Sequence, residues 1–164
     1  MKVREDTIEV SKLLKGIVIC RQTGVYLLDL ILDSEINPIL LSSFVGALSM
    51  FGSENMGKIE EIFIKGLDIQ MIIVNKYDLV LIAILDKDFV RGDMHVEAEK
   101  ALDMFYSLYK DEIGDSVELS IFEPFKKALY IQIKEYFNRI TEKSEIGDFG
   151  FFTQAITKLR NETH

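Results

Sequence analysis

Two apolar runs joined by a short turn constrain the fold of this chain more than any other feature. Residues 69–74 form a dense apolar run, residues 75–78 have turn chemistry, and residues 79–85 are the most apolar segment of the chain. Runs of this length, rich in Ile, Val and Leu, are typical of buried strands. We therefore predict a hairpin whose second strand lies in the centre of a sheet.

Three further runs extend this sheet. Residues 58–65 predict a strand before that hairpin, separated from it by a turn at 66–68. Residues 16–21 and 25–32 flank the turn sequence Gln22-Thr23-Gly24 and predict a second hairpin near the start of the chain. The regular spacing of the turns predicts antiparallel pairing, and therefore a five-stranded antiparallel sheet.

A helix is predicted between the two hairpins. Asn37 is a good N-cap, and Pro38 suits the first helical position because its missing N–H has no partner there. Large apolar residues recur at helical spacing and predict a core face: Leu41, Phe44, Val45, Leu48 and Phe51. Small residues between them would let the helix lie close to a sheet: Ser42, Ser43, Gly46, Ala47 and Ser49. Gly52 is expected to end the helix.

The last third of the chain has a helical period. One predicted stripe is Val96, Leu102, Phe105, Leu108 and Tyr109. A second predicted stripe is Phe125, Leu129, Ile133, Phe137 and Ile140. Its helix begins either with a capping box from Ser120 to Glu123 or with a first turn at Glu123-Pro124. At helical spacing, phenylalanines are expected in the core; these are Phe44, Phe51, Phe105, Phe125 and Phe137. Residues 5–15 fit either a short helix or a lead-in strand.

The predicted order is therefore β-β-α-β-β-β-α-α with terminal extensions, an α/β chain of the α+β type. The length of 164 residues fits one domain. The sequence has only two prolines and no Gly/Ser-rich stretch, so no linker is predicted that would divide it. We expect an N-terminal extension over 1–15, a domain over 16–141 and an amphipathic tail over 142–164.

Composition argues against several classes of function. The formal net charge of −8 disfavours nucleic acid and anionic lipid as partners. Residues 1–6 lack the apolar core of a signal peptide, and no apolar run reaches the roughly 20 residues of a membrane span. One cysteine and two histidines leave no cluster for structural zinc. We expect a cytoplasmic protein that does not insert into membranes and holds no metal or other cofactor.

Residues with chemical potential are few. The glycines at 46, 52 and 57 do not fit the spacing of a phosphate-binding P-loop. His95 is expected to be an exposed helix residue rather than a general base or metal ligand, since nothing completes a constellation around it. Asp86-Lys87-Asp88 is read as a solvated loop more readily than as a Mg²⁺ site. Cys20, within a predicted strand, is read as a small core residue. The chain is therefore expected not to be an enzyme.

Three local patterns resemble the longin domain and its structural relative, the roadblock domain. They are the hairpin Gly16-Ile17-Val18-Ile19 to Gly24-Val25-Tyr26-Leu27-Leu28, the helix Pro38 to Gly52, and Ala101-Leu102-Asp103-Met104-Phe105 with Tyr109 and Phe122-Glu123-Pro124-Phe125. The helix resembles the first helix of archaeal longin-like and roadblock-like proteins. The resemblance covers residues 12–140 and rests on core residues. The two-helix ending favours longin, whereas a helix within 5–15 would favour roadblock.

The resemblance implies a non-enzymatic protein-interaction module. Longin and roadblock domains dimerise and act as scaffolds, regulators or exchange-factor components for small GTPases in vesicle trafficking and motility. A homodimer, or a heterodimer with a related domain, and a small GTPase partner are therefore expected. The alternative is a small-molecule sensor of profilin-like or PAS-like architecture, for which Gln70 and Tyr77 are the polar candidates to line a cavity.

The tail carries its own aromatic cluster. After the longin-like region come four large apolar residues, which require a surface that can bury them: Phe149, Phe151, Phe152 and Ile156. An exposed cluster of this kind would promote aggregation. We expect these residues to fold back on the domain or to form a dimer or partner contact.

Overall fold

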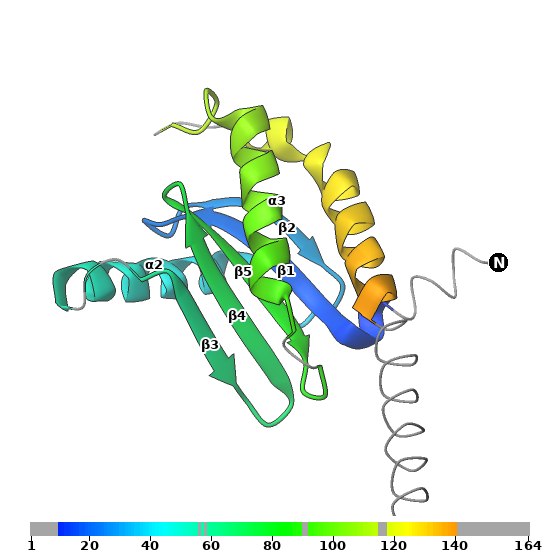
Figure 1. The fold of residues 1–164 in the computed structure, drawn as a ribbon. Coiled ribbons are helices and arrows are strands. Elements are labelled where there is room, and N and C mark those ends of the chain that lie inside the picture. Colours follow the sequence, from blue (N-terminus) through cyan, green and yellow to red (C-terminus); the bar gives the residue numbers. More distant parts are fainter. Residues whose placement is uncertain (1–9, 56, 58, 90–91, 115–117, 141–164) are drawn as a thin grey trace, which may run out of the picture. The chain divides into compact units, whose positions relative to one another are not determined.

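The computed structural model describes residues 10–55, 57, 59–89, 92–114 and 118–140 (Figure 1). The chain divides into two units, residues 1–130 and residues 131–164. The elements are β1 (Leu14–Arg21), β2 (Tyr26–Ile31), α2 (Pro38–Asn55), β3 (Glu61–Lys65), β4 (Ile69–Lys76), β5 (Leu79–Asp86), α3 (Met94–Tyr109) and the 3₁₀ helix η1 (Leu119–Phe122). Residues 10–13 and 125–140 are also helical.

The strands form one five-stranded antiparallel sheet in the order β2-β1-β5-β4-β3. β5 lies in the centre, paired with β1 on one side and with β4 on the other. Residues 79–85 are at most 2% exposed, as an interior strand rich in Leu, Ile and Val should be. The prediction of the sheet, its strand order along the chain and its central strand is confirmed.

α2 and α3 lie on opposite faces of the sheet (Figure 1). α2 packs on β1 and β2, and α3 packs on β4 and β5. Val45 of α2 shares a buried cluster with Val18, Cys20, Ile73 and Val80 of the sheet. The two helices therefore bury side chains on opposite faces of the same sheet.

An aromatic cluster fills the space beside α3. The ring of Phe105 lies 5.2 Å from that of Phe122 and 5.3 Å from that of Phe125. Tyr109 packs edge-on against Phe122 with a centroid distance of 5.2 Å. Phe105 and Phe125 are buried, as predicted from their helical spacing.

Several boundaries differ from those predicted. Of residues 5–15 the structure describes those from Val10 onward: residues 10–13 are helical and lead directly into β1. β3 begins at Glu61 rather than at residue 58, and α2 continues past Gly52 to Asn55. On α3, Val96 and Leu108 are 48% and 58% exposed, so the prediction that they face the core was wrong.

The buried face of α3 is set by small side chains. Ala98 and Ala101 lie on it together with Met94, Leu102 and Phe105. Alanines allow the helix axis to approach the sheet, and this turns the neighbouring Val96 and Leu108 outward. In the second unit, residues 131–140 are helical, and Ile133, Tyr136 and Phe137 are buried.

Candidate protein-interaction surface

The start of α2 is fixed by the residues that the sequence singled out. The side-chain oxygen of Asn37 accepts hydrogen bonds from the backbone N–H groups of Ile39 and Leu40, each at 3.1 Å. Pro38 occupies the first helical position. These contacts satisfy N–H groups that a helix end otherwise leaves without partners.

The face of α2 that contacts the sheet is made mostly of small residues. Ser42, Val45, Gly46, Ser49 and Gly52 are buried, with Val45 the largest of them. A Cβ atom on Gly46 would lie 2.6 Å from the Cα of Gly24, in the turn between β1 and β2. Gly24 itself has a φ of +95°, which favours glycine. Helix and turn backbones therefore touch at two glycines.

This close approach turns the large side chains of α2 away from the sheet. Phe44 is 49% exposed and Phe51 is 59% exposed, so the prediction that they lie in the core was wrong. Both the small and the large residues recur at helical spacing, and only one stripe can face the sheet. The small stripe does so because it permits contact between backbones.

We call the resulting surface the α2 outer face; its large apolar residues are Ile39, Leu40, Phe44, Met50 and Phe51. Their exposed fractions run from 49% to 69%. Residues 38–53 contain no Asp, Glu, Lys or Arg. Large apolar side chains gathered on one uncharged face are characteristic of an interaction site.

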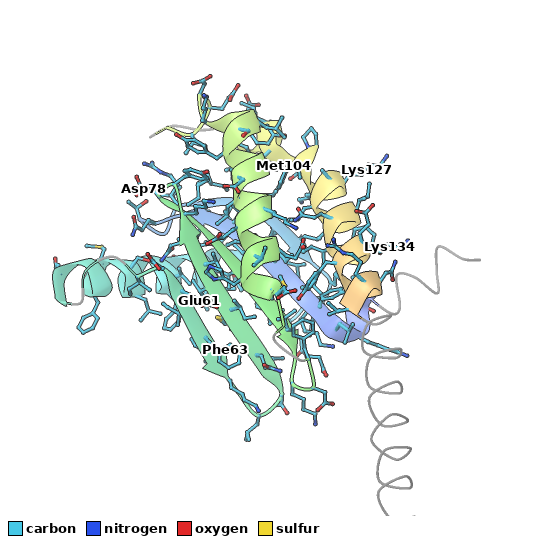
Figure 2. The ribbon with its side chains drawn as sticks, in the orientation of Figure 1. Glu61, Phe63, Asp78, Met104, Lys127 and Lys134 are labelled. Carbon is cyan, nitrogen blue, oxygen red and sulfur yellow. The ribbon has the colours of Figure 1, made fainter. Side chains whose placement is uncertain are left out.

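The open edge of the sheet adds to this apolar surface. β3 is an edge strand, and Phe63 and Ile64 on it are each 38% exposed. Leu67, in the turn between β3 and β4, is 93% exposed. Figure 2 shows Phe63 and Glu61 on β3, with α2 passing the end of β3 at which Glu61 lies. Edge strands with exposed apolar residues are templates for pairing with another chain.

His95 links α3 to this edge strand. Its Nε2 lies 2.8 Å from a carboxylate oxygen of Glu99, and its Nδ1 lies 3.5 Å from one of Glu61 on β3. The imidazole therefore lies between two carboxylates from different elements, an arrangement that the sequence could not show. The structure finds no group of three or more His, Cys, Asp or Glu side chains placed to hold a metal among the residues it describes.

A second polar contact joins α3 to β4. The ammonium of Lys76 lies 2.8 Å from a carboxylate oxygen of Asp103. The pKa of the Asp103 carboxyl is lowered, first by its hydrogen bond from Lys76 and then by one from the Tyr77 hydroxyl. The Tyr77 ring stacks on that of Tyr106 with centroids 4.3 Å apart. These contacts lie at the surface and hold the turn between β4 and β5 against the helix.

The polar candidates for a ligand cavity have structural partners. The side-chain amide of Gln70 lies within hydrogen-bond distance of the carbonyl oxygens of Asp86, Lys87 and Phe89, at 3.1, 2.7 and 2.8 Å. Gln70 thereby holds the loop between β5 and α3 against β4. Tyr77 is occupied by its contacts with α3.

The remaining candidate residues, Cys20 and Asp86, make contacts within the fold. Burial raises the pKa of the Cys20 thiol to about 11, and a hydrogen bond with Ser42 opposes this rise. Cys20 is fully buried, which confirms its reading as a core residue. The carboxylate of Asp86 accepts a hydrogen bond from the backbone N–H of Asp88 at 3.1 Å, which closes the loop after β5.

Comparisons with known proteins bear on the fold. No protein-family model matches the chain, and no curated protein matches it either. Solved structures do match. MglB of Myxococcus xanthus superimposes with a TM-score of 0.53 at 15% identity, over 67% of this chain and 90% of that one.

Two further structures agree. The gliding protein MglB of Thermus thermophilus gives a TM-score of 0.53 at 11% identity, over 65% of this chain and 90% of that one. A roadblock/LC7 domain of Streptomyces avermitilis gives 0.50 at 10% identity, over 61% and 89%. The chain has a roadblock-like fold. At these identities the likeness concerns the fold alone, and it confirms the resemblance to the longin and roadblock group.

The interface residues predicted in the tail, Phe149, Phe151, Phe152 and Ile156, lie outside the described residues. No helix that could cross a bilayer is found in the part of the chain that the structure describes. The α2 outer face was missed because two of its residues, Phe44 and Phe51, were assigned to the core. Two features of the sequence could have indicated this face: the absence of charged residues over 38–53, and the stripe of small residues on the other side of the helix.

Proposed function

We propose that this chain is a non-enzymatic protein-interaction module, a roadblock-like or longin-like scaffold or regulator of a small GTPase. The α2 outer face is the observation that carries the proposal. Fully burying a Leu, Ile, Met or Phe side chain contributes about 1.5–3 kcal/mol. An uncharged face with five such side chains that are each 49% to 69% exposed gains this free energy only when another surface covers it.

The chemistry of the surface fits a protein partner. The face is apolar and lacks charge, whereas the chain as a whole has a net charge of −8. Nucleic acid and anionic lipid would need basic side chains on the surface they meet, and residues 38–53 supply none. We propose a dimer as the first assembly, with a second copy or a related domain as the partner.

The small GTPase part of the proposal rests on the resemblance to longin and roadblock domains. A motility-like or trafficking-like setting in the cytoplasm belongs to the same proposal, and one structural neighbour is described as a gliding protein. No observation favours the sensor alternative, since Gln70 and Tyr77 have structural partners.

The GTPase proposal is tested by binding. Each small GTPase of the same organism is loaded with GDP or with a non-hydrolysable GTP analogue and titrated with the full chain by calorimetry. We expect at least one to bind with a micromolar or lower Kd and with a preference for one nucleotide. Absence of binding by every GTPase in both states would overturn the GTPase part.

The interaction surface is tested separately. The double variant Phe44→Ser with Phe51→Ser removes two aromatic rings from the α2 outer face while leaving the buried stripe intact. We expect it to lose self-association in sedimentation velocity at micromolar concentration. Leu108→Ser, at an equally exposed position on α3, is the matched control and should behave as the wild type. A wild-type chain that sediments only as a monomer would remove the homodimer.

A further inference from the structure

We propose that His95 is a proton-dependent clasp that joins the start of the edge strand β3 to α3. When the ring carries two protons, it donates hydrogen bonds to Glu61 of β3 and to Glu99 of α3 at once. When it carries one proton, it donates to Glu99 alone, and Glu61 is released from the ring. The His95 clasp operates within one copy of the chain, so it depends neither on a dimer nor on a GTPase.

The three side chains of the clasp come from two elements. His95 and Glu99 lie four positions apart on α3, which places them on the same side of the helix. Glu61 is the first residue of β3, an edge strand that pairs with β4. The body of α3 packs on β4 and β5. The contact between His95 and Glu61 therefore extends the reach of α3 past β4 to the edge of the sheet.

The two ring nitrogens of His95 have different contacts. Nε2 lies 2.8 Å from a carboxylate oxygen of Glu99, the distance of a charge-assisted hydrogen bond. Nδ1 lies 3.5 Å from a carboxylate oxygen of Glu61; it is buried and has no hydrogen-bond partner among the described residues. A neutral imidazole has one N–H and one lone pair. These distances therefore assign the N–H to Nε2 and the lone pair to Nδ1.

The lone pair of Nδ1 faces a carboxylate, which is itself an acceptor. Two acceptors that face each other form no hydrogen bond. A second proton, placed on Nδ1, turns the same contact into an ion pair, and rotation of the two side chains can then bring the 3.5 Å separation to hydrogen-bond distance. Proton uptake at this one atom therefore adds a bond between β3 and α3.

The charges around the ring suit a second proton. Among the described residues, the charged side chains on the elements around His95 are Glu61 and Lys65 of β3, Lys76 of β4, and Asp93, Glu97, Glu99, Lys100 and Asp103 in or next to α3. Residues 79–85 of β5 are all apolar. Lys76 lies 2.8 Å from Asp103, and Lys100 lies 3.3 Å from Glu97, so these four groups balance in pairs. A second proton on His95 places a positive charge between the negative charges of Glu61 and Glu99.

Other contacts of Glu61 do not prevent the clasp from closing. A carboxylate has about four lone-pair sites and can accept several hydrogen bonds at once. Histidine is the side chain that takes up its second proton within the physiological pH range. We therefore expect the clasp to close on mild acidification and to open as the pH rises. The strand that it holds carries the exposed side chains of Phe63 and Ile64, so the order of this apolar edge depends on pH.

The N–H of Ile62 reports on the opening of β3. The N–H of Asn75 donates to the carbonyl of Glu60, and the N–H of Gly66 donates to the carbonyl of Ile69. Hydrogen-bonded pairs alternate along an antiparallel ladder, so Ile62 and its partner on β4 form the next such pair after Glu60. The N–H of Ile62, directly after Glu61, therefore exchanges with solvent when the start of β3 opens.

Amide hydrogen exchange tests the clasp in the full chain. The protection factor of the Ile62 N–H is divided by that of Ile82 on the central strand β5, which removes changes in global stability. An exposed pair of opposite charges changes an equilibrium by up to about fivefold. We expect the ratio in the wild type to fall about two- to fivefold between pH 5.5 and pH 8.

Two variants with the same chemical change separate the clasp from other effects of pH. Glu61→Gln keeps the shape of the side chain but removes its charge, and its ratio should stay constant from pH 5.5 to 8. Glu60→Gln, one residue earlier at an exposed position, is the matched control and should keep the pH dependence of the wild type.

Nitrogen-15 shifts of the imidazole test the protonation states directly. The chain has two histidines, and the variant His164→Gln leaves the signals of His95 alone. At pH 8 we expect the proton of the His95 ring on Nε2, and at pH 5.5 we expect protons on both nitrogens. A proton on Nδ1 rather than Nε2 at pH 8 would overturn the assignment on which the clasp depends.

The exchange results are equally decisive. A wild-type ratio that stays constant from pH 5.5 to 8, or a pH dependence in Glu61→Gln equal to that of the wild type, would overturn the clasp. These measurements follow one strand within one copy of the chain. Their failure would leave the proposed function untouched, and failure of GTPase binding would leave the clasp standing.

Discussion

The contact between α2 and the first hairpin turn gives a sharp prediction for Gly46→Ala. In a helix interior, replacing Gly by Ala stabilises by about 1 kcal/mol when nothing else changes. Here the new Cβ would lie 2.6 Å from the Cα of Gly24, 2.7 Å from its N and 2.8 Å from the carbonyl oxygen of Thr23. All three are backbone atoms, so no side chain can rotate to make room.

The helix must therefore move off the turn. Forcing a methyl group into a filled site costs roughly 1–3 kcal/mol, and occasionally more. Contact with rigid backbone places this substitution at or above the upper end, so about 2 kcal/mol of net destabilisation remains after the gain in helix propensity. For a chain of this length that corresponds to a fall of roughly 4–8 °C in Tm.

Urea unfolding followed by circular dichroism measures this change. Gly114→Ala is the matched control, because no atom lies within 4 Å of the Cβ position there. We expect the control to unfold within about 0.5 kcal/mol of the wild type. If Gly46→Ala is as stable as the wild type or more so, α2 does not approach the turn as closely as described, and the reason given for the outward turn of Phe44 is wrong.

Three other substitutions or measurements check separate contacts. Asn37→Ala removes the side-chain oxygen that caps α2, and it should lower the free energy of unfolding in urea by about 1 kcal/mol. Ser43→Ala, on the exposed side of the helix, is the control and should change this free energy by less than half as much. Gln70→Leu removes the side-chain amide that donates to carbonyls at the end of β5 and in the following loop, and it should cost about 1–3 kcal/mol. Amide exchange in the loop before α3 should become faster, and unchanged exchange would contradict the role of Gln70. Cys20 should react with a thiol reagent at pH 8 only in denaturant. Folding raises the pKa of the Cys20 thiol from 9.0 to about 11. The stability that this shift contributes is therefore complete below pH 9 and is lost as the pH rises through 11. A free energy of unfolding that stays constant from about pH 8 to 11 would count against the burial of Cys20.

The sequence predicted the strands well because their signal is local. Residues 69–74 and 79–85 combine apolar character with turn residues on both sides, and few other structures accommodate such a pattern. The N-terminus of α2 was equally readable, since Asn37 and Pro38 act on the helix that immediately follows them. Contacts within a few residues of one another can be inferred without knowing the rest of the fold.

The orientation of α2 could not be predicted in the same way. Its large and its small residues each form a helical stripe, and the choice between them depends on Gly24, which lies 22 positions before Gly46. The bridge from Glu61 through His95 to Glu99 joins residues more than 30 positions apart. Such contacts depend on the packing of distant elements, so periodicity alone assigned the exposed phenylalanines to the core.

The central position of β5 has a consequence for how the protein folds during its synthesis. β1 pairs with β2 a few residues later, but its other partner, β5, begins at Leu79, 58 positions after Arg21. At roughly 5–20 residues per second, β1 waits about 3–12 s for that partner to be translated. Over this interval Ile17, Val18 and Ile19, which are fully buried in the finished sheet, lack one of the two strands that pair with β1. Slowing translation after β2 should therefore increase aggregation of the nascent chain, whereas slowing it after β5 should have little effect.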